Sequence, residues 1–249
     1  MMEESRSSVT PGVTPARGIK PNKPAMRDSR WLFFDLGNTL ISEEAATEAR
    51  IQQLVNSFER YGGRCSVEDV RSAFQQASRE FAPRLITRVI EKLSNDPKRH
   101  KLILAESRYP KELEVPYEGV EQSLRALSSR YRIGVIANQP LGTVERLTRW
   151  GLMPFVSLCL SSSAEEHVEK PNRVIFELAL SRAGCTASHA VMIGDRLDND
   201  IRPAKLLGWR TIRVTQGFGR LQSPRDGWDE ADRTVANVNV LVPDLMGGC

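Results

Sequence analysis

Short apolar runs alternate with longer amphipathic segments along most of the chain. A run of four to six apolar residues indicates a buried strand, and apolar residues spaced three and four apart indicate a helix. The runs are 31–34, 133–137, 155–160, 190–193 and 211–214, and the helical patterns are 118–131, 141–150, 172–183 and 200–207. Gly184 and Gly208 supply stop signals for the last two helices. Strands alternating with helices predict an α/β fold with a Rossmann-like parallel sheet.

The segment 42–116 interrupts this alternation with helical patterns only. Helices are predicted over 43–60, from the capping-box sequence at Ser66 onward, over 85–93 and over 98–108. We therefore predict a flexible tail over 1–30, an α/β core over 31–41 and 117–249, and an all-helical insertion over 42–116. An insertion that leaves the end of the first strand stands over the crevice where ligands bind, which favours a lid over a passive bundle.

Charge and composition argue against several classes of protein. The net charge of +4 comes mainly from residues 1–30, which are rich in Ser, Pro, Thr and Arg and carry +3. The remainder has 29 basic and 28 acidic residues, so we expect no nucleic-acid partner. We also expect no membrane partner, because no apolar stretch is long enough to span one. The four cysteines are widely spaced and form no Cys-x-x-Cys pair, which favours a reducing, cytoplasmic location.

Carboxylates follow two of the predicted strands. Asp35 ends the first run, and three aspartates, Asp195, Asp198 and Asp200, follow the fourth. Three carboxylates in six residues repel one another unless a cation or basic groups lie nearby. The acidic loop can be solvated, with Asp200 starting the next helix, or it can hold a divalent cation. Lys170, at a predicted helix start before Pro171, could neutralise a phosphate.

Four segments in this order resemble the motifs of the haloacid dehalogenase-like hydrolase superfamily, most of whose members are magnesium-dependent phosphatases. They are Phe33-Phe34-Asp35-Leu36-Gly37-Asn38-Thr39, Ile136-Ala137-Asn138, Lys170-Pro171 and Gly194-Asp195-Arg196-Leu197-Asp198-Asn199-Asp200. The resemblance covers about residues 31–214, and the helical insertion resembles that family's cap.

The resemblance implies a role for each matching position. Asp35 would be the nucleophile, forming a phosphoaspartate, and also a ligand of Mg²⁺. The carbonyl of Gly37 and the carboxylate of Asp195 would be further ligands, with Asp200 completing the acidic set. Asn138 and Lys170 would contact the phosphoryl oxygens, and Thr39 offers a donor beside the nucleophile.

Two positions depart from the family pattern. The family's phosphatases usually carry an aspartate as general acid and base where this chain has Gly37, and such a group is worth about 10²–10⁴ in rate. Ala137 stands where Ser or Thr usually donates to the phosphoryl group, and losing one bond to a charged partner costs about 1.5–3 kcal/mol. Glu43, Glu44 and His100 of the predicted cap are conceivable sources of the missing acid.

The first hypothesis is therefore a magnesium-dependent phosphatase of small phosphorylated metabolites, favouring leaving groups that need little protonation. The alternative is a catalytically weakened phospho-ligand-binding or regulatory protein, for which Gly37 and Ala137 speak. Dehalogenation by Asp35 is a third possibility, but the retained Asp195 and Asp200 argue against it. Substrate choice depends on cap residues, and the sequence specifies no oligomeric state.

Overall fold

The computed structural model describes residues 29–139, 142–161 and 168–246. Apart from Ser29 and Arg30, the tail predicted over 1–30 lies outside the described residues, as does Cys249. Among the described residues, no helix combines the length and the apolar character needed to cross a membrane.

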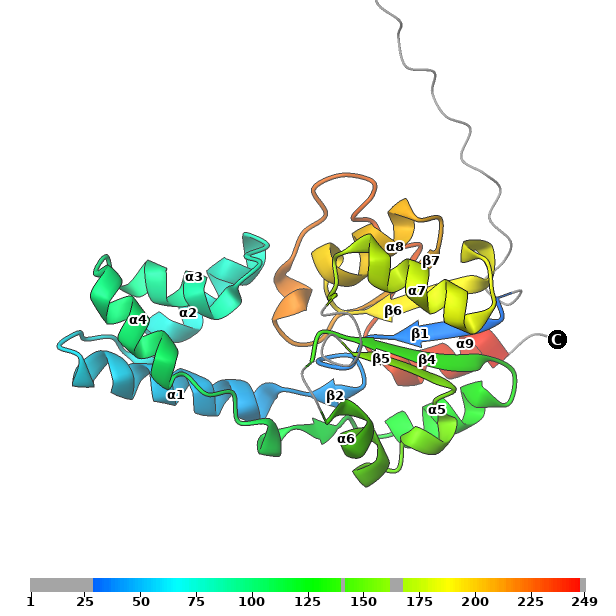
Figure 1. Cartoon of the computed structure of the whole chain (residues 1–249), viewed down its shortest axis with the longest axis horizontal. Coiled ribbons are helices and arrows are strands. Elements are labelled where there is room, and N and C mark those ends of the chain that lie inside the picture. The colour runs from blue at the N-terminus through cyan, green and yellow to red at the C-terminus, as the bar shows by residue number, and fades with distance from the viewer. Residues whose placement is uncertain (1–28, 140–141, 162–167, 247–249) are drawn as a thin grey trace, which may run out of the picture.

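The core is a parallel sheet with the strand order β5-β4-β1-β6-β7-β8 within the described residues (Figure 1). Its strands are β1 (Trp31–Phe34), β4 (Arg132–Ala137), β5 (Leu158–Ser161), β6 (Ala190–Gly194), β7 (Arg210–Val214) and β8 (Arg233–Val235). β1 lies between β4 and β6, and Phe34 is in register with Val135 on one side and Ile193 on the other. The residues that follow these three strands therefore meet at one edge of the sheet.

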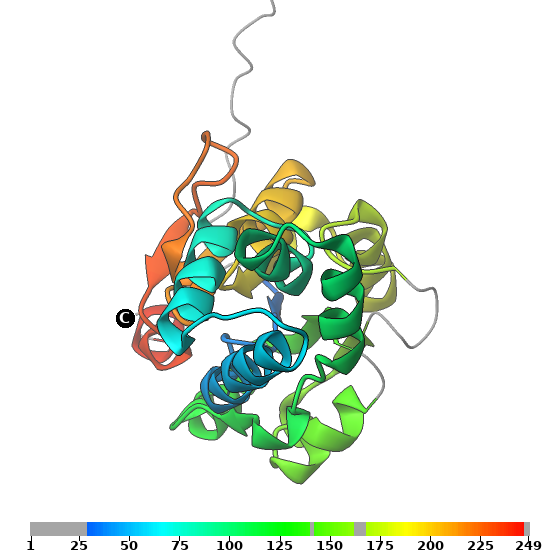
Figure 2. The same ribbon diagram turned by 90° about the vertical axis from the view of Figure 1, so that its left-hand side faces the viewer.

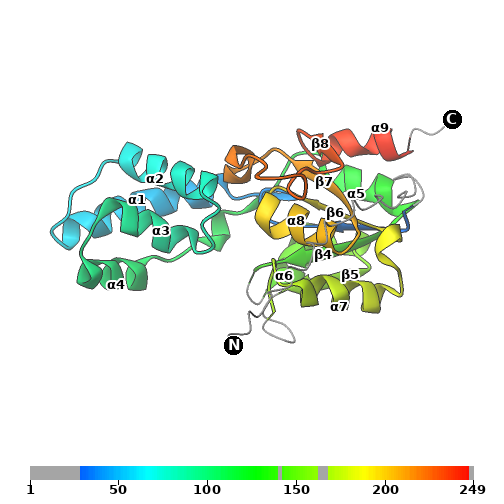
Figure 3. The same ribbon diagram turned by 90° about the horizontal axis from the view of Figure 1, so that it is seen from above.

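Helices cover both faces of the sheet. One face packs against α5 (Val120–Ser128), α6 (Thr143–Arg149) and α9 (Leu241–Met246), and the other packs against α7 (Arg173–Ala183) and α8 (Arg202–Leu206) (Figures 1 and 3). Successive residues of β1 serve opposite faces: Leu32 and Phe34 join the first layer, whereas Trp31 and Phe33 join the second. All four are buried, which explains why the strand reads as a continuous apolar run.

A helical cap extends from the carboxyl edge of the sheet (Figures 1 and 2). The chain enters it through β2 (Ile41–Ser42) and returns through β3 (Val115–Pro116), which pair antiparallel. Between them lie α1 (Glu44–Arg60), α2 (Val67–Arg79), α3 (Leu85–Leu93) and α4 (Pro97–Glu106). The cap has its own buried cluster, which includes Leu54, Phe58 and Phe74. Ser66 and Asp69 form the expected capping box at the start of α2.

The structure confirms the predicted α/β fold class with an all-helical insertion after the first strand. Three local features differ from the sequence pattern. β5 begins at Leu158, because Met153–Phe155 form a 3₁₀ turn, η3. The segment Leu197–Ile201 forms a π-helical turn, η5, ahead of a short α8. The short strands β2, β3 and β8 have no counterpart among the predicted elements.

Candidate active site

Asp35 follows β1 at the carboxyl edge of the sheet. Its backbone N–H donates to the carbonyl of Ile193 at 2.8 Å, which continues the pairing with β6 by one residue. Its Oδ1 accepts from Lys170 Nζ at 2.6 Å, and its Oδ2 lies 3.5 Å from the hydroxyl of Thr39. The Asp35 side chain is 13% exposed, so it can still meet a ligand.

Lys170 is a buried cation between two carboxylates. Its Nζ donates to Asp35 Oδ1 and, at 2.7 Å, to Asp200 Oδ1. Burial alone would lower the pKa of this lysine, but the charges of Asp200 and Asp35 outweigh it and raise the pKa. The ammonium group therefore stays charged next to the nucleophile.

Asn138, after β4, uses its side chain to hold Lys170. Its Nδ2 donates to the Lys170 carbonyl at 2.6 Å, and its Oδ1 accepts from the Lys170 N–H at 2.7 Å. In this arrangement the carboxamide positions the lysine backbone. The phosphoryl contact expected of Asn138 stays a prediction.

The acidic loop after β6 brings Asp195 and Asp200 into the same buried space. Asp200 Oδ2 accepts from the Arg196 N–H at 3.0 Å, so both of its oxygens have partners. The absence of a side chain at Gly194 makes room for this carboxylate, since a Cβ there would lie 2.6 Å from Asp200 Cβ. Burial, with the neighbouring charge of Asp35, raises the pKa of Asp195 well above its usual range. Burial also raises the pKa of Asp200 to about 6, although Lys170 opposes the shift.

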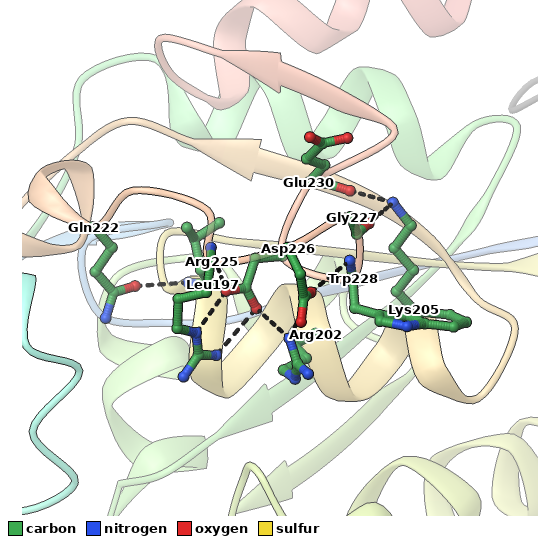
Figure 4. Close-up of polar contacts among 10 residues, drawn as sticks. Leu197, Arg202, Lys205, Gln222, Arg225, Asp226, Gly227, Trp228 and Glu230 are labelled. Atoms are coloured by element: carbon green, nitrogen blue, oxygen red, sulfur yellow. Dashed lines mark hydrogen bonds and ion pairs between the residues drawn. The ribbon is translucent and has the colours of Figure 1, made fainter.

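Asp198 does not join this cluster. It pairs with the guanidinium of Arg196 and accepts from Gln222 Nε2 at 2.8 Å. The other end of the Gln222 side chain accepts from the Leu197 N–H at 2.8 Å (Figure 4). Asp198 and Gln222 therefore tie the acidic loop to the 3₁₀ turn η6 (Phe218–Leu221) that follows β7.

The acidic residues fit a divalent cation. Oxygen atoms of Asp35, Asp195 and Asp200 all lie within 4.8 Å of one another. An all-oxygen set of this kind suits Mg²⁺. Gly37, two residues beyond Asp35, is placed by its bridge to Ile41. Its carbonyl as a ligand stays a prediction.

Glu43, the residue before α1, is the nearest of the three conceivable acids to the nucleophile loop. Its Oε2 accepts from Asn38 Nδ2 at 2.8 Å, and its Oε1 lies 3.3 Å from Gln139 Nε2. Burial, followed by the charges of Asp35 and Glu114, raises the pKa of Glu43 to about 7. Glu44 is exposed, and His100 Nε2 lies 2.5 Å from the Ser94 carbonyl within the cap.

Two adjoining cavities lie between the cap and the core. The smaller, of about 180 Å³, reaches the acidic cluster at Asp195, and its lining also includes Glu43, Arg196, Arg50 and Tyr109. The larger, of about 470 Å³, has a volume typical of small-ligand pockets. Phe218 of η6 lines both. Sequence reasoning missed Arg50 and Phe218 as cavity residues, because neither lies in one of the four motif segments. Arg196 lies in the fourth segment and could have been singled out.

Comparison with known proteins agrees with this geometry. A family model described as haloacid dehalogenase-like hydrolase matches residues 30–208. A glyceraldehyde 3-phosphate phosphatase of Methanopyrus kandleri is 30% identical over 216 residues, 81% of this chain and 90% of that one. A protein of the same name from Methanocaldococcus jannaschii is 33% identical over 129 residues, 51% of this chain and 55% of that one.

A solved structure shows the same fold at lower identity. It is the HAD-hydrolase YfnB of Bacillus subtilis, bound to magnesium, with a TM-score of 0.65 and 21% identity. The match covers 87% of this chain and 98% of YfnB. The family match over residues 30–208 and the Methanopyrus relative together show that this chain belongs to the haloacid dehalogenase-like hydrolases.

Proposed function

We propose that this hydrolase is a magnesium-dependent phosphatase of small phosphorylated metabolites that acts through a phosphoaspartate on Asp35. The observation that carries the proposal is the buried bridge of Lys170 Nζ, 2.6 Å from Asp35 Oδ1 and 2.7 Å from Asp200 Oδ1. It fixes a partly exposed carboxylate nucleophile and keeps a positive charge where a phosphoryl group would sit.

Each residue of the site has a part in this chemistry. A carboxylate oxygen of Asp35 attacks phosphorus, and water later releases phosphate, so that one difficult step becomes two easier ones. Lys170 offsets the phosphoryl charge, Asn138 holds Lys170, and Thr39 orients the nucleophile. Asp35, the Gly37 carbonyl and Asp195 would hold Mg²⁺, with Asp200 in support. When bound, Mg²⁺ supplies further positive charge to the phosphoryl oxygens.

The relatives guide the choice of substrate. Two of them are named glyceraldehyde 3-phosphate phosphatases, so triose phosphates are the first substrates to test.

Cys65, Cys159 and Cys185 are free thiols, in keeping with the proposed cytoplasmic location.

A weakened phospho-ligand-binding protein is the alternative, suggested by Gly37 and Ala137. The juxtaposition of Asp35, Lys170 and Asp195 favours the enzyme, because a binding protein has no need of a nucleophile beside a buried lysine and a metal-ligating carboxylate. The phosphatase names of the relatives also favour it. Dehalogenation is disfavoured by the buried acidic cluster, which matches the needs of a metal.

A substrate screen tests the proposal. We expect release of phosphate from small phosphomonoesters in the presence of Mg²⁺, loss of activity in EDTA, and no activity in Asp35→Asn. We also expect beryllofluoride to be retained by the wild-type protein only with Mg²⁺. Tight binding of a phosphorylated ligand without turnover, unchanged by Asp35→Asn, would instead establish the binding protein.

A further inference from the structure

We propose that Glu43 carries the proton in this reaction, in the place that a side chain at residue 37 would otherwise take. This inference rests on the proposed phosphatase function and assigns it one more catalytic residue.

The carboxyl group of Glu43 lies beside Gly37. A Cβ atom built on Gly37 would lie 2.7 Å from Glu43 Cδ and closer still to Oε1. The carboxyl group of Glu43 therefore occupies the volume into which a side chain at residue 37 would project. Gly37 is not among the glycines with positive φ, so its backbone does not require glycine. A larger residue at position 37 would have to displace the Glu43 carboxyl group from the bonds that hold it.

Two amide side chains hold the carboxyl group of Glu43. Asn38 comes from the turn after β1 and Gln139 from the loop after β4, and their amide groups contact different oxygens of Glu43. Asn38 adopts a left-handed conformation, φ 52°, which asparagine tolerates. Gln139 in turn accepts from Arg146, which also pairs with the buried Glu114. These contacts fix the carboxyl group at the end of a network, as a reacting group requires.

Glu43 also faces the smaller cavity between the cap and the core. Glu43 lines the same small cavity as Asp195, whose carboxylate lies within the cluster around Asp35. A substrate whose phosphoryl group meets Asp35 would extend its leaving group into this cavity. Glu43 directly precedes α1, the first helix of the cap. A movement of the cap toward the core would therefore also move the proton donor toward the substrate.

The reaction has two steps. In the first step, an Asp35 oxygen bonds to phosphorus and the bond to the leaving oxygen breaks, while the Glu43 carboxyl gives its proton to that oxygen. An alcohol and a Glu43 carboxylate result. In the second, water bonds to phosphorus and the bond to Asp35 breaks, while Glu43 takes one proton of the water. Phosphate leaves, and both side chains return to their starting forms.

The test compares leaving groups. For Glu43→Gln we expect kcat/KM for an alkyl phosphate to fall by about 10²–10⁴ and that for p-nitrophenyl phosphate by about tenfold or less. The preference for leaving groups that need little protonation, which the sequence predicts from Gly37, would then be strong in Glu43→Gln and weak in the wild type. Glu59→Gln makes the same change at an exposed position of α1 and serves as the control. Equal losses on both substrates, or none, would overturn the proposal.

A pair of substitutions separates proton transfer from packing. Gly37→Asp alone should impair the enzyme, because its Cβ collides with Glu43. Gly37→Asp combined with Glu43→Ala moves the carboxylate to residue 37 and should recover alkyl phosphate turnover by at least about tenfold over Glu43→Gln. If the double variant folds but shows no recovery, Glu43 is not the proton carrier. If Asp35→Asn is as active as wild type, the proposed phosphatase function itself fails.

Discussion

The side chain of Asn138 holds both backbone polar groups of Lys170, at 2.6 and 2.7 Å, across 32 residues of sequence. The lysine whose ammonium touches the nucleophile is thus positioned through its own backbone. For Asn138→Ala we expect kcat/KM to fall about 10–100-fold, because two hydrogen bonds worth about 1 kcal/mol each no longer place the charge.

Steady-state kinetics with the best substrate of the screen would measure this loss. Asn56→Ala, at an exposed position of α1, should leave kcat/KM unchanged. An Asn138→Ala protein with wild-type kinetics would show that Lys170 needs no such support.

Lys170 also stabilises the folded protein. Lys170→Met would leave Asp35 and Asp200 facing each other without their shared cation, and breaking a buried pair of this kind costs about 3–5 kcal/mol. Urea denaturation in EDTA at neutral pH should show that loss. Adding Asp200→Asn should recover part of it, because one of the opposed charges is gone.

Lys92→Met is the matched control. Lys92 pairs with Glu80, which is 36% exposed, so its loss should cost less than about 1 kcal/mol. Equal effects of the two methionine substitutions would contradict a special role for the buried bridge.

Asp229 predicts a pH dependence of stability away from the active site. It accepts from Arg225 and Arg202, in the network that also joins Asp226 to Arg202 (Figure 4). Burial alone would raise the pKa of Asp229, but its bonds with Arg225 and Arg202 outweigh burial and lower the pKa to about 2. A depressed pKa stabilises the fold above the unfolded-state value of about 3.9, and that contribution disappears as the pH falls through about 2.

We therefore expect the stability difference between the wild type and Asp229→Asn to be constant above about pH 5 and to shrink by about 2 kcal/mol between pH 4 and 2. Urea denaturation across this range measures it. Asp226→Asn, which removes an exposed partner of Arg202, should change much less. A difference that does not vary with pH would mean that Asp229 is not ionised in a paired state.

Hydrophobic periodicity was enough to predict the main strands and helices. Each of these elements buries one or both faces. A strand buried on one face shows alternating apolar residues, a strand buried on both faces shows an apolar run, and a helix shows apolar residues three and four apart. β2, β3 and β8 have two or three residues, too few to show any period. β8 is placed by pairing with β7, and β2 and β3 are placed by pairing with each other across the whole cap, which a local pattern does not contain.

The site was predictable to a similar extent. The order of the motifs placed Asp35 and Asp195 at strand ends and Lys170 at a helix start, and the structure brings the three residues together. The use of the Asn138 carboxamide depends on the path of a loop 32 residues later in the chain. The fit of Glu43 beside Gly37 depends on the turn between β1 and β2. Both contacts depend on the path of the chain in three dimensions, which residue types alone do not determine.

The contact between η6 and the cap predicts an effect of the cap on substrate binding. Phe218 stacks on Phe74 of α2 with ring centroids 5.6 Å apart, and its carbonyl accepts from the Ser78 hydroxyl at 2.7 Å. Ser78→Ala removes that hydrogen bond, worth about 1 kcal/mol, between the cap and the core. We expect KM to rise about fivefold and kcat to change little, because the bond lies away from Asp35 and holds the cap against the core beside the cavities. Ser72→Ala, on the same helix and outside this contact, should leave both constants unchanged. A fall in kcat without a rise in KM would instead place the contact in the chemical step or in product release.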